Sequence, residues 1–272
     1  MHTFQNIKTN EEINIPSDID ELDPDQYLKY IELIDTAETI CMPIHELRLH
    51  ILKIVCPVSL GFRYLIMSKD SRSDTETRLY QLSEKMDSFF DIEETGNKKT
   101  YMAHKRCGTN LLPTWNGLRG PEDMLNNITW GDFVSCMNLL NAYRKAFEDE
   151  ELEEAKRIVT ELFHILYTGT SDKKMVVPVS VEMHALTFFC YVFELISSVP
   201  IPIHGEEIDF RILFSGNGST GKDSKMGWSG LVFSVAESGV FGRTEDVNKE
   251  SFWPVLLYLY KCTFDNQNLK RK

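Results

Sequence analysis

Three segments in the first ninety or so residues carry apolar residues three and four positions apart, a spacing that places them on one side of a helix. They are Leu28, Ile31 and Ile34 in the first segment, Ile44, Leu47, Ile51 and Val55 in the second, and Leu79, Leu82 and Met86 in the third, from Asp74 to Met86. Asp23 can cap the first helix and Pro24 suits its first position, because a capping side chain accepts from free backbone N–H groups and proline lacks one. The first two helices form a predicted hairpin that ends at Pro57.

The pattern changes after residue 89. Residues 98 to 104 alternate between apolar and polar positions after the turn signal Gly96-Asn97, which predicts a β-hairpin over 89–106. Glycine and proline are then frequent from Gly108 to Asp123, which predicts an irregular surface loop. We interpret 108–126 as a possible boundary between an N-terminal helical region with a β-hairpin, 1–107, and a C-terminal helical domain, 127–272.

The clearest helical pattern begins at Thr129, whose hydroxyl can cap a helix while Asp132 reaches back as in a capping box. Its predicted apolar face comprises Trp130, Phe133, Val134, Met137, Leu140 and Phe147. A second amphipathic helix follows the acidic run Glu148 to Glu151. Its apolar positions are Leu152, Ala155, Val159, Leu162 and Leu166.

Residues 179–199 are apolar almost all round, which is typical of a helix enclosed by others. We therefore place the centre of the C-terminal core there. A short strand is expected from Phe210 to Phe214, followed by a glycine-rich loop and by helices near 228–238 and 246–265. The predicted fold is mainly α (α+β), with a helical bundle-like core, a small β-hairpin and irregular Gly/Pro loops.

Composition narrows the class of protein. Hydrophobic residues make up 42% of the 272 residues and charged residues 26%, as in folded soluble proteins. The formal charge of -12 argues against general nucleic-acid binding, which depends on Lys and Arg. Six widely separated cysteines indicate reduced thiols, and the N-terminal sequence lacks a secretory signal pattern. Glu182, His184 and Glu194 argue against a membrane span over 179–199. We expect an intracellular protein without membrane contact.

The sharpest chemical motif is G-x-x-x-x-G-K from Gly216 to Lys222, directly after the predicted strand. Such a loop binds phosphates through backbone N–H groups and its lysine. Here Asp223 stands where Ser or Thr would ligate Mg²⁺, and about 50 residues follow, too few for the usual nucleotide-binding sheet. We interpret the segment as a Gly/Ser-rich loop. Nucleotide binding through Gly216, Gly221 and Lys222 is the alternative.

Other candidate sites fail on spacing. His45 and His50 are five residues apart, which places them about 140° apart around a helix, so they cannot bind zinc together. Asp18 to Asp25 resembles a calcium loop, but Asp23 stands where an EF-hand needs glycine. No nucleophile elbow is present. We expect no cofactor, no metal and no catalytic residue, and keep a small-molecule enzyme with a scattered site as a further alternative.

Two stretches carry a family resemblance: residues 116–133, N-G-L-R-G-P-E-D through N-I-T-W-G-D-F, and residues 227–242, from Gly227-Trp228 to Ser238-Gly239-Val240-Phe241-Gly242. They are similar to segments of uncharacterised tailed-phage and prophage proteins encoded among virion and tail genes. The resemblance implies a non-enzymatic structural or tail-assembly protein whose partners are phage structural proteins or further copies of itself. The resemblance also implies a place in the cytoplasm of a host cell or in the virion. The predicted contact surfaces are the loops 108–123 and 216–227, and the predicted partner contacts are Trp115, Arg119 and Trp228. Exposed aromatic residues anchor many interfaces, which is the reason for choosing Trp115. The alternative for Trp115 is that it folds back onto its own domain.

Overall fold

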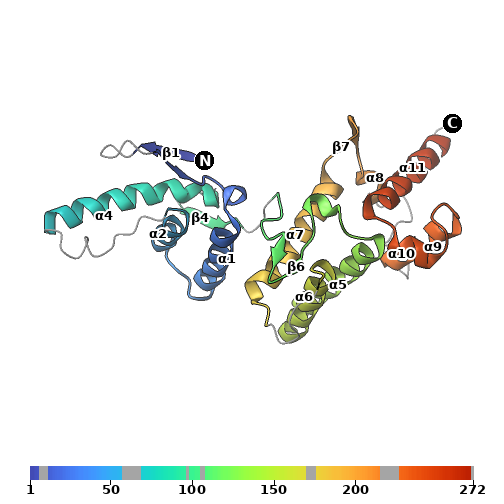
Figure 1. The fold of residues 1–272 in the computed structure, drawn as a ribbon, viewed down its shortest axis with the longest axis horizontal. Helices are drawn as coiled ribbons and strands as arrows, with labels where there is room; N and C mark the ends of the chain where they lie inside the picture. Colours follow the sequence, from blue (N-terminus) through green and yellow to red (C-terminus); the bar gives the residue numbers. More distant parts are fainter. Residues whose placement is uncertain are drawn as a thin grey trace. The chain divides into compact units, whose positions relative to one another are not determined.

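Helices make up most of the described chain, which confirms the mainly α prediction (Figure 1). The computed structural model describes residues 1–5, 12–56, 69–95, 98–104, 108–169, 176–214 and 227–270. Within these ranges the strands form two-stranded antiparallel pairs. The chain divides into two compact units, Met1–Cys107 (unit 1) and Gly108–Lys272 (unit 2).

Unit 1 is built from a helical pair, a third helix and two hairpins. Its helices are α1 (Pro24–Thr39), α2 (Ile44–Val55) and α4 (Lys69–Ser83), with 3-10 helices at Ile19–Glu21 and Glu84–Phe89. Its strand pairs are β1 (His2–Gln5) with β2 (Glu12–Ile15), and β3 (Phe90–Thr95) with β4 (Lys98–Ala103). The cap predicted at Asp23 is confirmed, because its side chain accepts from the N–H of Gln26 at 2.8 Å. The hairpin predicted over 89–106 is also confirmed.

The third helix of unit 1 differs from the prediction. The α-helix ends at Ser83, and the backbone continues as a 3-10 helix through Phe89. Three residues per turn place Met86 and Phe89 on the same side, and both are fully buried. The Phe89 ring lies 5.6 Å from that of Tyr30, whose hydroxyl donates to the carbonyl of His104 at 2.8 Å. The 3-10 segment therefore joins α1 to the β3–β4 hairpin.

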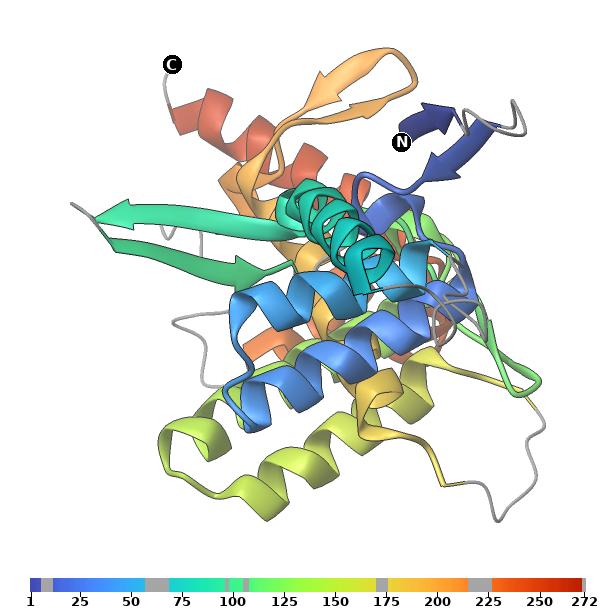
Figure 2. The same cartoon turned by 90° about the vertical axis from the view of Figure 1, so that its left-hand side faces the viewer.

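Unit 2 contains the longest helices. They are α5 (Trp130–Glu148), α6 (Leu152–Leu166), α7 (Val179–Ser198), α8 (Arg211–Phe214), α9 (Gly227–Glu237), α10 (Thr244–Lys249) and α11 (Phe252–Lys270), with a 3-10 helix at Asp123–Leu125. The strands β5 (Thr114–Trp115) and β6 (Leu118–Arg119) form one hairpin, and β7 (Ile201–Ile203) and β8 (Glu206–Ile208) form another. Figure 2 shows the second hairpin extending away from the helices. The capping box predicted at Thr129 and Asp132 is confirmed.

Aromatic side chains form the core of unit 2. Phe133 is at its centre, 4.4 Å from Phe252 and 5.8 Å from Phe189 between ring centroids. Trp130 stacks on Phe133 at 5.5 Å and on Phe252 at 6.1 Å. All four rings are fully buried, so this cluster holds α5, α7 and α11 together through apolar burial.

Three predictions for unit 2 are wrong. Residues 211–214 form the short helix α8, not a strand, because Asp209 accepts from the N–H of Arg211 at a helix start. The helix expected over 246–265 is two helices, α10 and α11, separated by extended backbone at Glu250. Phe147 is 61% exposed and stacks on Tyr143 of its own helix, so it is not part of the buried face predicted for α5.

The loop predicted over 108–123 is more ordered than expected. It contains the β5–β6 hairpin, and Asn110, Leu112, Leu118, Gly120 and Pro121 within it are buried. Asn110 donates through Nδ2 to the carbonyl of Pro121 at 2.6 Å, which explains why a glycine- and proline-rich segment packs inward.

Among the described residues, α7 is the one helix long and apolar enough to cross a membrane by length and composition. Half of its most apolar window is buried inside unit 2, including Val181, Ala185 and Phe189. Core helices of soluble proteins pass the same test, so this property alone assigns no location.

Candidate functional site

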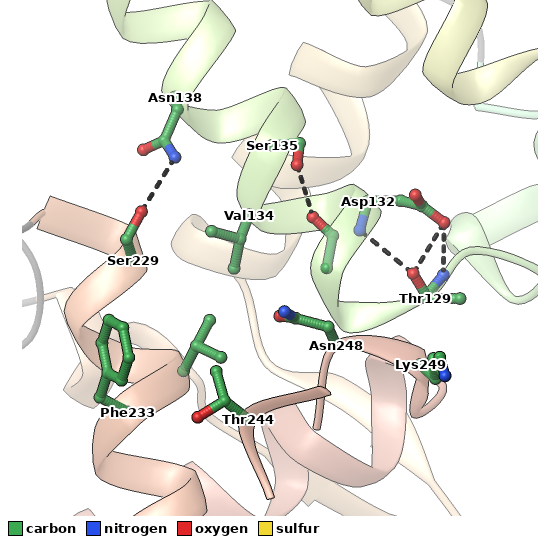
Figure 3. Close-up of a pocket in the computed structure, with 12 residues that line it drawn as sticks. Thr129, Asp132, Val134, Ser135, Asn138, Ser229, Phe233, Thr244, Asn248 and Lys249 are labelled. Atoms are coloured by element: carbon green, nitrogen blue, oxygen red, sulfur yellow. Dashed lines mark hydrogen bonds between the residues drawn. The ribbon is translucent and has the colours of Figure 1, made fainter. Parts of the chain in front are cut away.

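A pocket of about 500 Å³ opens between α5, α9 and α10 of unit 2 (Figure 3). Its lining is formed by Thr129, Gly131, Asp132, Val134, Ser135 and Asn138 from the start of α5, Ser229, Val232 and Phe233 from α9, and Thr244, Asn248 and Lys249 from α10. Figure 3 shows Asn138 and Ser229 bridging α5 and α9 at one edge, and Lys249 at the other.

The wall between α5 and α10 depends on a glycine. A Cβ added to Gly131 would lie 2.8 Å from the backbone carbonyl oxygen of Asn248, closer than real Cβ atoms approach. Two backbone hydrogen bonds join residues beside these elements: the N–H of Trp130 donates to the carbonyl of Glu250 at 2.7 Å, and the N–H of Phe252 donates to that of Ile128 at 3.1 Å. Main-chain hydrogen bonds therefore connect the start of α5 to the segment after α10 beside the pocket.

Most polar groups that line the α5 wall are occupied by hydrogen bonds within the protein. Asp132 Oδ2 accepts from the Thr129 hydroxyl at 2.7 Å, and the Ser135 hydroxyl donates to the carbonyl of Gly131 at 2.8 Å. Asn138 Nδ2 donates to the Ser229 hydroxyl oxygen at 3.3 Å. The lining residues include no histidine, and their one carboxylate, that of Asp132, bonds to Thr129, so neither serine is paired with a general base. The pocket is built for hydrogen bonding and apolar contact.

The exposed part of the pocket offers suitable groups for such contact. Phe233 is 47% exposed, and Asn248 and Lys249 are also accessible to solvent. The pocket therefore presents an aromatic ring, an amide and an ammonium group to solvent.

Residues 116–133 and 227–242, the two segments for which a resemblance was expected from the sequence, both contribute to this pocket. Residues 116–133 end in the start of α5, and residues 227–242 comprise α9 and the turn after it. The first segment lines the pocket with Thr129, Gly131 and Asp132, and the second lines it with Ser229, Val232 and Phe233. About one hundred residues separate the segments in sequence, so their meeting is a property of the fold.

A second cavity, of about 510 Å³, lies beside the β7–β8 hairpin. It is more apolar and is lined by Met124, Asn126, Ile201, Pro202, Ile203, His204, Trp253, Pro254 and Leu257. Trp253 is oriented by its Nε1, which donates to the carbonyl of Met124 at 3.0 Å. No residue of the segment 227–242 lines this cavity.

The predicted contact residues lie at different places in unit 2. The Trp115 ring is half-buried and packs edge-on against Phe163 at 6.0 Å, as the alternative expectation for it stated. Trp228 is half-buried and packs edge-on against Phe133 at 5.6 Å, which places it at the rim of the aromatic core. Arg119 is exposed and pairs with Glu122. None of the three lines the pocket.

The G-x-x-x-x-G-K segment from Gly216 to Lys222 lies outside the described residues. The element that precedes it is the helix α8 and not the strand on which the phosphate-loop comparison relied. Among the described residues no group of three or more His, Cys, Asp or Glu could hold a metal ion. Burial raises the pKa of the Cys136 thiol, so that thiol is protonated at neutral pH.

Sequence reasoning missed a buried polar pair, Asn110 and His184. Asn110 Oδ1 accepts from the backbone N–H of Leu112 at 2.9 Å and lies 2.9 Å from His184 Nε2. Burial lowers the pKa of His184 to about 3, so the imidazole is neutral at physiological pH. A lone histidine in an apolar helix was the available signal, but its partner is 74 residues away in sequence.

Comparisons with protein-family models, with curated proteins and with solved structures found no match for this chain. The fold alone therefore classifies this chain: it is a mainly α protein with small antiparallel hairpins.

Proposed function

We propose that this chain is a non-enzymatic structural or assembly protein of a phage-like particle, and that it binds a protein partner at the pocket between α5, α9 and α10. The observation that carries the proposal is the meeting of the two phage-like segments at opposite walls of that pocket. Both segments contribute to one pocket, so a single binding role accounts for the resemblance of both. The partner is a phage structural protein or a further copy of this chain, in the host cytoplasm or in the virion.

The chemistry of the pocket supports protein binding over catalysis. Its serine hydroxyls are not paired with a base, and Phe233, Asn248 and Lys249 present apolar, amide and cationic groups to solvent. A partner loop that places an apolar residue against Phe233 and a carboxylate near Lys249 would satisfy these groups.

The proposal is tested by co-expressing the tagged full chain with each virion and tail protein encoded in the same phage or prophage genome, and by measuring the captured pairs by calorimetry. Ser229→Arg places a long side chain in the pocket, and we expect it to weaken binding at least tenfold. Ser234→Arg, on an exposed position of α9 outside the pocket lining, is the matched control and should bind as the native chain does. Binding of none of these proteins, or equal binding by Ser229→Arg, would overturn the proposal.

A further inference from the structure

The β7–β8 hairpin extends away from the helices of unit 2 and has one face in solvent (Figure 2). Residues directly opposite each other in an antiparallel pair share a face, and successive residues of a strand alternate between faces. Pro202 is directly opposite Glu207, and both are exposed. On the other face Ile201 is buried and Ile208, opposite it, is half-buried. The hairpin therefore presents a proline ring and a carboxylate together to solvent.

The Glu207 carboxylate forms no ion pair among the described residues, whereas Asp209, just after the hairpin, pairs with Arg211. Each strand of the hairpin has three residues. A pair of such short strands is marginally stable in water unless another surface packs against it. The hairpin thus carries an unpaired charge beside an apolar ring, on an element that gains stability when it is covered.

The pocket between α5, α9 and α10 carries the complementary groups. Figure 3 shows Asn248 between Phe233 and Lys249. Lys249 is exposed, and within the described part of the chain its ammonium group forms no ion pair. Asp132 bonds to Thr129 and caps the positive N-terminal end of α5, so its charge is already compensated there. An unpaired ammonium group near an aromatic ring matches a carboxylate beside an apolar ring.

The two complementary surfaces are not joined within one copy. None of the residues 201–208 lines the pocket of their own chain. A second copy supplies what each surface lacks, because every copy carries one hairpin and one pocket. A contact between different surfaces of identical subunits builds rings or open chains, and two copies that exchange hairpins close as a dimer.

We propose that the β7–β8 hairpin of one copy docks in the pocket between α5, α9 and α10 of another copy. The Pro202 ring packs against Phe233, and the Glu207 carboxylate accepts hydrogen bonds from Asn248 and Lys249. This inference rests on the proposed function, because it names a second copy of the chain as the partner at that pocket.

Charge exchange between hairpin and pocket tests the pairing in the full chain. Sedimentation velocity of the native chain alone should show concentration-dependent association. Glu207→Lys and Lys249→Glu should each weaken this association about tenfold or more, because each places like charges at the contact. The chain that carries both changes should associate again. So should an equimolar mixture of the two single variants, since each variant supplies the complement of the other.

Glu206→Lys is the matched control. It makes the same change of charge in the same hairpin, but on the other face, opposite Ile203. In about 0.15 M salt, where charges more than about 8 Å apart are largely screened, it should weaken association less than about threefold. Circular dichroism establishes that every variant is folded.

A native chain that stays monomeric overturns the inference. If that monomer still captures a virion protein, and Ser229→Arg weakens the capture, the proposed function holds with that protein as the partner. Association that Glu207→Lys or Lys249→Glu leaves unchanged also overturns the inference, as does association that neither the double variant nor the mixture restores. Equal losses in Glu206→Lys and Glu207→Lys would overturn the assignment of the contact to the face with Pro202 and Glu207.

Discussion

Asn110 connects the loop 108–123 to itself and to α7 through buried hydrogen bonds. Its side chain bonds to the carbonyl of Pro121, to the N–H of Leu112 and to His184, and its own N–H donates to Asp123 at 2.7 Å. A buried amide that satisfies several backbone groups stabilises one conformation of the loop over others, because each alternative leaves polar groups unpaired.

His184 predicts a dependence of stability on pH. Its pKa is about 3 in the folded chain and near 6.5 when exposed, because burial disfavours the imidazolium. Between these values the unfolded chain binds a proton that the folded chain does not. The free energy of unfolding should therefore fall as pH decreases from 6.5, by up to about 1.4 kcal/mol per pH unit from this group.

His184→Gln separates this contribution from that of the carboxylates. Glutamine can donate to Asn110 Oδ1 but does not titrate. Urea unfolding measured at pH values from about 7 to about 4.5 should show a shallower loss of stability for His184→Gln than for the native chain. Parallel curves would show that His184 is not the group that binds the extra proton.

Gly131→Ala is predicted to destabilise unit 2. Alanine in a helix ordinarily stabilises relative to glycine by about 1 kcal/mol, but here its Cβ would lie 2.8 Å from the carbonyl oxygen of Asn248. Backbone cannot move aside cheaply, so we expect a net loss of about 1–3 kcal/mol in urea unfolding. Asn141→Ala, at an exposed position of the same helix, should leave stability within about 0.5 kcal/mol. A Gly131→Ala variant as stable as that control would refute the close contact.

At the scale of elements, apolar periodicity predicted α1, α2, α5, α6 and α7 correctly, because each buries one face or most of its surface. It failed where tertiary contacts decide the backbone, as at Glu84–Phe89, where burial of Met86 and Phe89 favours a 3-10 helix. The β7–β8 hairpin was not predicted. Its turn, His204-Gly205, has positive φ at both residues, as a type I′ hairpin turn requires. In the sequence, the signal for this hairpin is Gly205, which stands between the two short segments that form β7 and β8.

The α5–α6 turn stores strain at Glu150. Its φ is 58°, a left-handed conformation in which glycine is favoured over other residues. Glu150→Gly should therefore raise the free energy of unfolding by about 1 kcal/mol. Glu148→Gly, within helical backbone, should lower it by about the same amount. Urea unfolding of both variants checks the pair, and a destabilised Glu150→Gly would contradict the strain.

Viewed as a whole molecule, the chain has two units that divide between Cys107 and Gly108. Each has its own fully buried side chains, such as Tyr30 and Phe89 in unit 1 and Trp130 and Phe133 in unit 2. We expect residues 1–107 and 108–272 to fold when expressed separately. Each fragment should show a helical circular dichroism spectrum and a cooperative urea transition. Loss of the transition in residues 108–272 would show that unit 2 is not autonomous.

The pocket could be predicted from the sequence only in part. The cap at Thr129 and Asp132 follows from local spacing, and both residues line the pocket. The contribution of Asn248 and Lys249 could not be foreseen, because the break at Glu250 that ends α10 is set by hydrogen bonds to residues 128–130 far away in sequence. Trp115 and Trp228 were predicted as partner contacts, but both are half-buried. Each packs against a phenylalanine far away in sequence, Phe163 and Phe133, and the sequence pattern does not show such contacts.

The two hydrogen bonds between residues 128–130 and 250–252 also couple two helix starts. Trp130 begins α5 and Phe252 begins α11, and each donates its amide proton to the strand-like segment beside the other. The two bonds flank one antiparallel bridge between Thr129 and Ser251, so we expect them to open together. The amide protons of Trp130 and Phe252 should therefore exchange with deuterium at matching, slow rates, as members of one cooperative opening unit.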